Sequence, residues 1–130
     1  MAAWGFGNFE NDDALDWTAD LIDIGEELIP EAFARVKEAV DDYLEADLCS
    51  FALAAAEVVA AMNGKPSADL PEEVTEWLTG RPAPAADLLS SARSAVLAIF
   101  RSSELRDVWK QQEQLEEWEP RVQDLSRRLG

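Results

Sequence analysis

The chain is 130 residues long, with 48% hydrophobic and 29% charged residues, a composition typical of one globular domain spanning residues 1–130. It contains no histidine and a single cysteine. This excludes Ser-His-Asp and Cys-His nucleophile systems, His-ligated metal sites, a structural zinc site and an internal disulfide. The net charge of −16 argues against nucleic acid or an anionic membrane as a ligand, because phosphate groups are bound by clustered Lys and Arg.

The negative charge is concentrated in the N-terminal part, since residues 1–47 contain 14 acidic and 2 basic residues. Such a surface attracts a basic protein or a divalent cation. The chain lacks glycine-rich phosphate loops, a secretory signal pattern and any apolar run long enough to span a bilayer. We therefore expect a cytoplasmic protein, and no motif calls for a cofactor.

The chain opens with MAAWGFGNFENDDALDW, a stretch dense in aromatic, glycine and acidic residues. We expect residues 1–11 to form an extended arm anchored on the fold. Gly5 and Gly7 allow the backbone to approach other atoms closely. Phe9 can pack on the first turn of the following helix, and Trp4 and Trp17 can pack with it.

Two amphipathic helices are expected next. Asn11 and Asp12 suit a helix N-cap, which predicts a helix over residues 12–24 or slightly beyond. Its apolar stripe, at spacings of three and four, consists of Trp17, Leu21, Ile24 and Leu28. The second helix has Pro30 in its first turn, where the missing N–H has no cost, and its stripe consists of Phe33, Val36, Val40 and Leu44.

A third helix over residues 46–62 is apolar on nearly every side, so we expect it at the centre of the fold. Pro120 lies in the last predicted helix and is compatible with a straight helix only in its first turn. The fold class is all-α, a single-domain irregular bundle of six or seven helices with an N-terminal extended arm. The other expected elements are a loop at 64–70, a short helix at 71–78, a loop at 80–86, and helices at 87–100, from 104 after the N-cap Ser103, and at 115–129.

Five acidic residues of the first helix fall on one flank within about 80° of arc, namely Asp13, Asp16, Asp20, Asp23 and Glu27. Like charges at this spacing destabilise an isolated helix by about 0.2–0.5 kcal/mol per pair. The plainest interpretation is a solvated face, with or without pairing to Arg121, Arg127 or Arg128 from the basic C-terminus. The alternatives are a docking face for a basic partner protein and a site for Mg²⁺ or Ca²⁺, which carboxylates alone can bind.

Three other features have a functional and a structural interpretation. Glu57 is the lone charge in the apolar third helix, and a buried carboxyl group could serve as an acid or base. We expect it at the rim of the helix, reaching solvent. Cys49 has no basic neighbour that would activate it, so we expect a small core residue. Trp77, Trp109 and Trp118 lie on helical apolar stripes and are expected in the core.

The opening stretch resembles the start of a bacterial family known only as domain of unknown function 4259, with the pattern Trp-Gly-x-Gly-x-Phe-x-Asn-Asp-x-Ala-x-Asp-Trp. The matching residues are Trp4, Gly5, Gly7, Phe9, Asn11, Asp12, Ala14, Asp16 and Trp17. SSELRDVWKQQ (102–112) and VQDLSRRL (122–129) are similar to further family segments. The resemblance covers most of the chain and implies a fold relative with no established activity.

We expect a small acidic helical protein, not an enzyme, that binds a basic protein partner through its acidic N-terminal half. The expected partner-binding residues are Asp13, Asp16, Asp20, Asp23 and Glu27. The alternative is a carboxylate-based divalent-cation-binding protein or metal-dependent enzyme that uses Asp12, Asp13, Asp16 and Glu57. The oligomeric state stays open.

Overall fold

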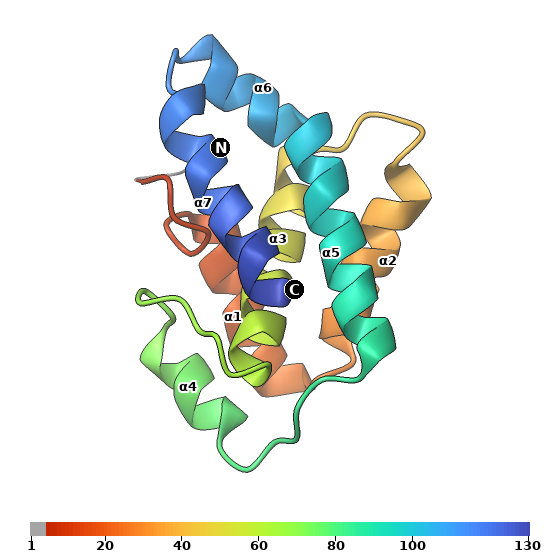
Figure 1. Ribbon diagram of the computed structural model, residues 1–130, viewed down its shortest axis with the longest axis vertical. Helices are drawn as coiled ribbons and strands as arrows, with labels where there is room; N and C mark the ends of the chain where they lie inside the picture. Colours follow the sequence, from red (N-terminus) through yellow and green to blue (C-terminus); the bar gives the residue numbers. More distant parts are fainter. Residues whose placement is uncertain (1–4) are drawn as a thin grey trace.

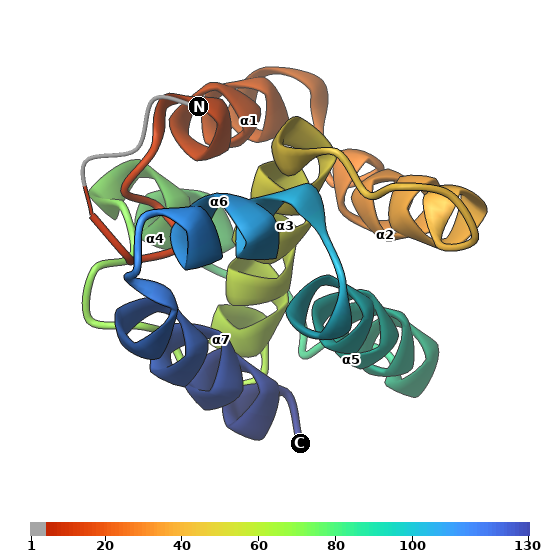
Figure 2. The same cartoon turned by 90° about the horizontal axis from the view of Figure 1, so that it is seen from above.

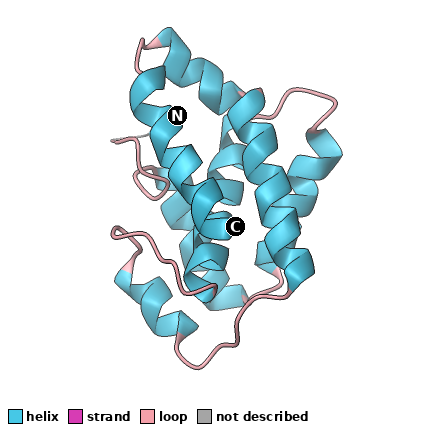
Figure 3. Ribbon diagram, in the orientation of Figure 1, coloured by secondary structure: helices cyan, strands magenta, loops and turns pink. Residues whose placement is uncertain are grey.

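The computed structural model describes residues 5–130, and this part of the chain forms seven α-helices and no β-strand (Figures 1 and 3). The helices form an irregular bundle, which confirms the predicted fold class. Their bounds are α1 Asp12–Ile24, α2 Leu28–Ala39, α3 Ala46–Met62, α4 Glu72–Leu78, α5 Ala86–Arg101, α6 Glu104–Gln111 and α7 Leu115–Leu129.

Helix α3 lies at the centre of the bundle and contacts α1, α2, α5, α6 and α7 (Figure 2). Its sequence explains this position, because small and apolar residues occupy every side and let neighbouring helices approach closely. From Ala52 to Ala60 every residue is buried. The central position predicted for this helix is confirmed.

Local capping sets the ends of several helices. The Asn11 side chain caps α1 by accepting a hydrogen bond from the Ala14 N–H at 2.8 Å, and Ser103 caps α6 through the Arg106 N–H at 3.1 Å. Gly64, with φ +82°, ends α3 in a left-handed turn. Each of these ends agrees with the predicted boundary.

The first helix ends at Ile24, the predicted bound, although the apolar stripe assigned to it extends to Leu28. Gly25 has φ +132° and donates its N–H to the Leu21 carbonyl at 3.0 Å, which terminates α1 at Ile24. Glu27 therefore precedes α2 as its N-cap, and Leu28 is the first residue of α2. Ile24, expected on the inward face, is 56% exposed. The extension of the acidic and apolar stripes to residues 27 and 28 of one helix is thus wrong.

The second helix also ends earlier than its predicted stripe. Pro30 lies in the first turn of α2 as expected, but the helix stops at Ala39, and Val40 is 49% exposed. Leu44 is nevertheless buried, in the connection to α3. Its carbonyl accepts the Glu104 N–H at 2.8 Å, and this bond ties the connection to the start of α6.

Pro120 lies inside α7 rather than in its first turn, which is the position that the sequence makes unfavourable for a straight helix. The proline removes one hydrogen bond from the helix interior. Buried side chains before and after the proline pack α7 against the bundle, namely Trp118, Val122, Leu125 and Leu129. Tertiary packing of this face outweighs the local cost of the proline.

The aromatic and cysteine predictions are confirmed with one exception. Trp109, Trp118 and Cys49 are buried. Trp77 is only half-buried and packs at the edge of the core, with the Arg81 guanidinium 3.5 Å from the centre of its ring.

The described part of the N-terminal arm is anchored as predicted. Asn8, Phe9 and Asn11 are buried, and the ring of Phe6 lies 4.9 Å from that of Trp109. The arm folds into a turn rather than running fully extended, because the Glu10 N–H donates to the Gly7 carbonyl at 3.0 Å. The predicted contact of Trp4 falls outside the described residues.

Candidate functional site

A groove of about 190 Å³ lies beside α1, between this helix and residues of α2 and α3. We call it the acidic groove. Its α1 residues are Asp13, Asp16, Trp17, Asp20 and Ile24, its α2 residues are Leu28, Glu31, Ala32 and Arg35, and α3 contributes Leu48 and Phe51. The lining thus combines carboxylates from α1 and α2 with apolar side chains from all three helices.

The structure brings together three of the five acidic residues predicted to bind a partner. Asp13, Asp16 and Asp20 line the acidic groove because their spacing puts them on one flank of α1. Asp23 does not line the groove although it is exposed on the same helix, and Glu27 lies beyond the end of that helix. The site is therefore narrower than the predicted stripe.

These carboxylates are unpaired in the part of the chain that the structure describes. Within residues 5–130, Asp13, Asp16 and Asp20 form no side-chain hydrogen bond or ion pair. The arginines expected to neutralise them lie elsewhere, since Arg127 and Arg128 both contact Asp124 on their own helix. Arg121 forms no ion pair with them either, so pairing with the C-terminal arginines is not observed within residues 5–130. Asp16 and Asp20 are exposed, which agrees with the interpretation of the stripe as a solvated face.

Arg35 is the one basic residue that lines the acidic groove in the described chain, and it forms no ion pair there. Sequence reasoning missed Arg35 and Glu31 as groove residues. Their spacing of four places them on one face of α2, but the spacing does not say which helix this face meets. Leu48 and Phe51 were missed for the same reason.

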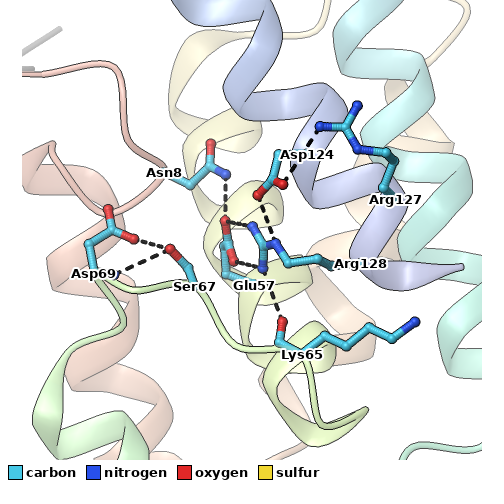
Figure 4. A network of polar contacts seen from close by, with 8 residues as sticks. All are labelled: Asn8, Glu57, Lys65, Ser67, Asp69, Asp124, Arg127 and Arg128. Carbon is cyan, nitrogen blue, oxygen red and sulfur yellow. Dashed lines mark hydrogen bonds and ion pairs between the residues drawn. The ribbon is translucent and has the colours of Figure 1, made fainter.

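Glu57 is buried, only 2% exposed, which contradicts the expected rim position. Its Oε1 accepts a hydrogen bond from Arg128 Nη1 at 2.8 Å (Figure 4). Its Oε2 accepts one from Arg128 Nη2 at 3.0 Å and another from Asn8 Nδ2 at 2.8 Å. A buried charge persists because this bidentate pair and the amide replace its lost hydration.

The rest of the network joins distant parts of the chain around Arg128. Its Nε donates to Asp124 at 2.8 Å, and its Nη1 donates to the Lys65 carbonyl at 3.2 Å. Hydrogen bonding to Glu57 raises the pKa of Arg128, so the guanidinium stays charged. The network connects the arm, α3, the loop after α3 and α7, and its geometry serves to hold these elements together.

The cation alternative has no preformed ligand set in the part of the chain that the structure describes. No group of three or more acidic or cysteine side chains is arranged there to hold a metal ion. Asp12, Asp13 and Asp16 do not converge with Glu57, whose two oxygens already accept three hydrogen bonds.

A larger groove of about 560 Å³ lies between α2 and α5, and none of the predicted site residues lines it. Its polar lining consists of Lys37, Ser90, Ser91 and Ser94, and the rest is apolar. Size alone favours this groove, but the acidic groove contains the candidate carboxylates.

Among residues 5–130, no helix combines the length and apolar character that crossing a bilayer requires.

Comparison with known proteins places the chain in a family without assigning an activity. No curated protein and no solved structure matches it. A family model described as Domain of unknown function (DUF4259) matches residues 2–121, which include the arm, the acidic groove and Glu57. The chain therefore belongs to the DUF4259 family, as its opening motif indicated.

Proposed function

We propose that this protein is a non-enzymatic binding protein whose acidic groove docks a basic protein partner. One observation carries the proposal: Asp13, Asp16 and Asp20 line an apolar groove and have no basic partner within residues 5–130. Unneutralised carboxylates beside apolar surface complement a partner with Lys and Arg around an apolar patch.

The charge distribution supports the same proposal at longer range. The 14 acidic and 2 basic residues of 1–47 give this N-terminal part a strongly negative electrostatic field, which speeds its encounter with a basic protein. A cytoplasmic location, expected from the composition and the single cysteine, stays a prediction. The expectation that the protein binds neither nucleic acid nor a membrane also stays a prediction.

Partner capture by the immobilised protein tests the proposal. The groove variant Asp13→Asn/Asp16→Asn/Asp20→Asn removes three negative charges. The control variant Glu113→Gln/Glu116→Gln/Glu117→Gln removes three exposed charges near the start of α7. Both variants and the unaltered protein are incubated with lysate of the native host and washed with increasing salt.

We expect the unaltered protein and the control variant to retain the same basic proteins, and the groove variant to lose them. Because salt screens charges over about 8–10 Å, these proteins should elute at moderate salt. Identical capture by all three proteins, or capture of acidic proteins only, would refute the proposal.

Thermal unfolding with Mg²⁺, Ca²⁺ or Mn²⁺ tests the cation alternative. Binding to the folded state raises stability in a saturable manner. The proposal predicts no such effect. A large saturable shift that Asp13→Asn/Asp16→Asn abolishes would instead favour a cation-binding protein.

A further inference from the structure

We infer that the acidic groove receives one large apolar side chain of a basic protein segment, whose neighbouring Lys or Arg residues contact Asp13, Asp16 and Asp20. The inference rests on the proposed function and specifies the chemistry of the partner. It assigns two separate tasks to the groove, namely anchoring by the apolar lining and orientation by the carboxylates.

The volume of the groove sets the size of the anchor. Pockets for small-molecule ligands and cofactors measure roughly 300–1,000 Å³, whereas the acidic groove has about 190 Å³. An apolar cavity of about 150 Å³ is enough to hold benzene. The groove therefore matches one leucine or aromatic side chain better than a whole cofactor.

The lining favours an apolar anchor. Trp17, Leu28, Leu48 and Phe51 line the groove from three different helices. Ile24, at the end of α1, also lines it and is 56% exposed. A partner side chain seated here removes apolar surface from water on both molecules, which is the usual role of an anchor residue at an interface.

The carboxylates select the surroundings of that anchor. Asp13, Asp16 and Asp20 succeed each other along α1, so they present a row of negative charge beside the apolar lining. Lys or Arg residues on either side of the anchor can reach this row. Arg35, on α2, repels a base at its own position, which gives the partner a preferred orientation.

A second copy of this chain is a poorer occupant. Each copy carries a net charge of −16, and residues 1–47 hold most of it, so two acidic grooves repel each other. A basic segment of another protein gains the same apolar contact with attraction in place of repulsion.

Two fluorescent peptides test the inference. Both are short, lysine-rich and identical except for one central residue, which is Leu in the first and Ser in the second. Their dissociation constants are measured by fluorescence anisotropy at low salt, with the full-length protein. Burial of a leucine contributes about 1.5–3 kcal/mol, and 1.4 kcal/mol is tenfold, so we expect the Leu peptide to bind about 10- to 100-fold more tightly.

Three variants separate the two tasks of the groove. Asp13→Asn/Asp16→Asn/Asp20→Asn should weaken both peptides by a similar factor. Leu48→Gln should remove most of the advantage of the Leu peptide and leave the Ser peptide unchanged. Leu97→Gln, at an exposed site of α5 outside the groove, should change neither, and circular dichroism checks that each variant is folded.

The outcomes distinguish this inference from the proposed function. Equal affinity of the two peptides, or failure of both to bind the unaltered protein, overturns the inference of an apolar anchor. If partner capture still depends on the three aspartates, the proposed function stands without it. Self-association that Leu48→Gln abolishes would show that a second copy occupies the groove, which also overturns the inference.

Discussion

Replacing Arg128 with Met should destabilise the protein by about 3–5 kcal/mol, because it leaves a buried carboxylate without its counter-ion. The Glu57 side chain is 3% exposed, and two of its three hydrogen bonds come from Arg128. The variant leaves it Asn8 alone. It also removes the contacts of the guanidinium with Asp124 and the Lys65 carbonyl.

Arg127→Met is the matched control, since the same substitution is made at the neighbouring position of the same helix turn. The Arg127 side chain is 72% exposed and lies 3.7 Å from Asp124, whereas that of Arg128 is 16% exposed. An exposed pair of this kind contributes at most about 1 kcal/mol. Both variants lose one positive charge near the C-terminus of α7, so they differ in the burial of the side chain and in the hydrogen bonds that Arg128 alone donates, to Glu57, Asp124 and the Lys65 carbonyl.

The double variant Glu57→Gln/Arg128→Met tests whether the uncompensated charge causes the loss. Glutamine keeps a carbonyl oxygen for the Asn8 amide and carries no charge, so the double variant should be more stable than Arg128→Met alone. If the two substitutions were independent and both destabilising, their losses of unfolding free energy would add, and the double variant would be less stable than Arg128→Met.

Urea unfolding followed by tryptophan fluorescence measures these effects, since a loss of 3–5 kcal/mol moves the midpoint by about 1 M or more. The loss is a large part of the roughly 5–15 kcal/mol that stabilises a typical domain. Equal midpoints for the Arg128 and Arg127 variants would refute the reasoning. A double variant less stable than Arg128→Met would refute the role given to the buried charge.

Three further predictions concern single sites. Tyr43 donates a hydrogen bond to Asp107, which raises the pKa of its phenol from 10.0 to about 12. The hydrogen bond therefore contributes to stability fully below pH 10, and this contribution is lost as the pH rises toward 12. A tyrosinate absorbance titration of this single tyrosine should give a midpoint near 12, and the midpoint should be lower in Asp107→Asn. Burial raises the pKa of the Cys49 thiol to about 12, so a thiol reagent should modify it at neutral pH only after unfolding, and rapid labelling of the native protein would contradict this. Gly25→Ala should lower the free energy of unfolding by about 1–3 kcal/mol in urea titration because of its φ of +132°, and unchanged stability would show that the backbone there relaxes.

Features specified by neighbouring residues could be predicted from the sequence. The start of α1 follows from the side chain of Asn11, and the end of α3 follows from Gly64. The end of α1 at Ile24 follows from Gly25 in the same way, and only the extension of the first apolar stripe to Leu28 was wrong, because periodicity carries no information about backbone angles. Each of these outcomes depends on atoms within a few residues along the chain.

Features that depend on distant residues could not be predicted in the same way. Glu57 is buried because Asn8 and Arg128, 49 and 71 positions away along the chain, satisfy its carboxylate. A lone charge in an apolar helix signals a need for partners, but not which residues supply them. Likewise, the spacing along α1 was enough to predict three carboxylates of the acidic groove. Arg35 and Phe51 belong to it only because three helices pack together, which the sequence of one helix does not show.

The distribution of ion pairs connects stability with the proposed function. Within residues 5–130, four carboxylates are paired with arginines, namely Glu26, Glu57, Glu119 and Asp124, and all four lie outside α1. On α1, like charges lie four residues apart at Asp12/Asp16 and Asp16/Asp20, and three apart at Asp13/Asp16 and Asp20/Asp23. None of these aspartates forms an ion pair with a basic residue in the described part of the chain.

Such pairs destabilise the helix by about 0.2–0.5 kcal/mol each, and the helix dipole offsets this only in the first turn. The groove variant Asp13→Asn/Asp16→Asn/Asp20→Asn should therefore unfold at higher urea concentration, by about 1 kcal/mol, while it binds basic peptides more weakly. Opposite changes in stability and binding are the signature of charges retained for recognition. A variant that loses both would show that these aspartates support the fold itself.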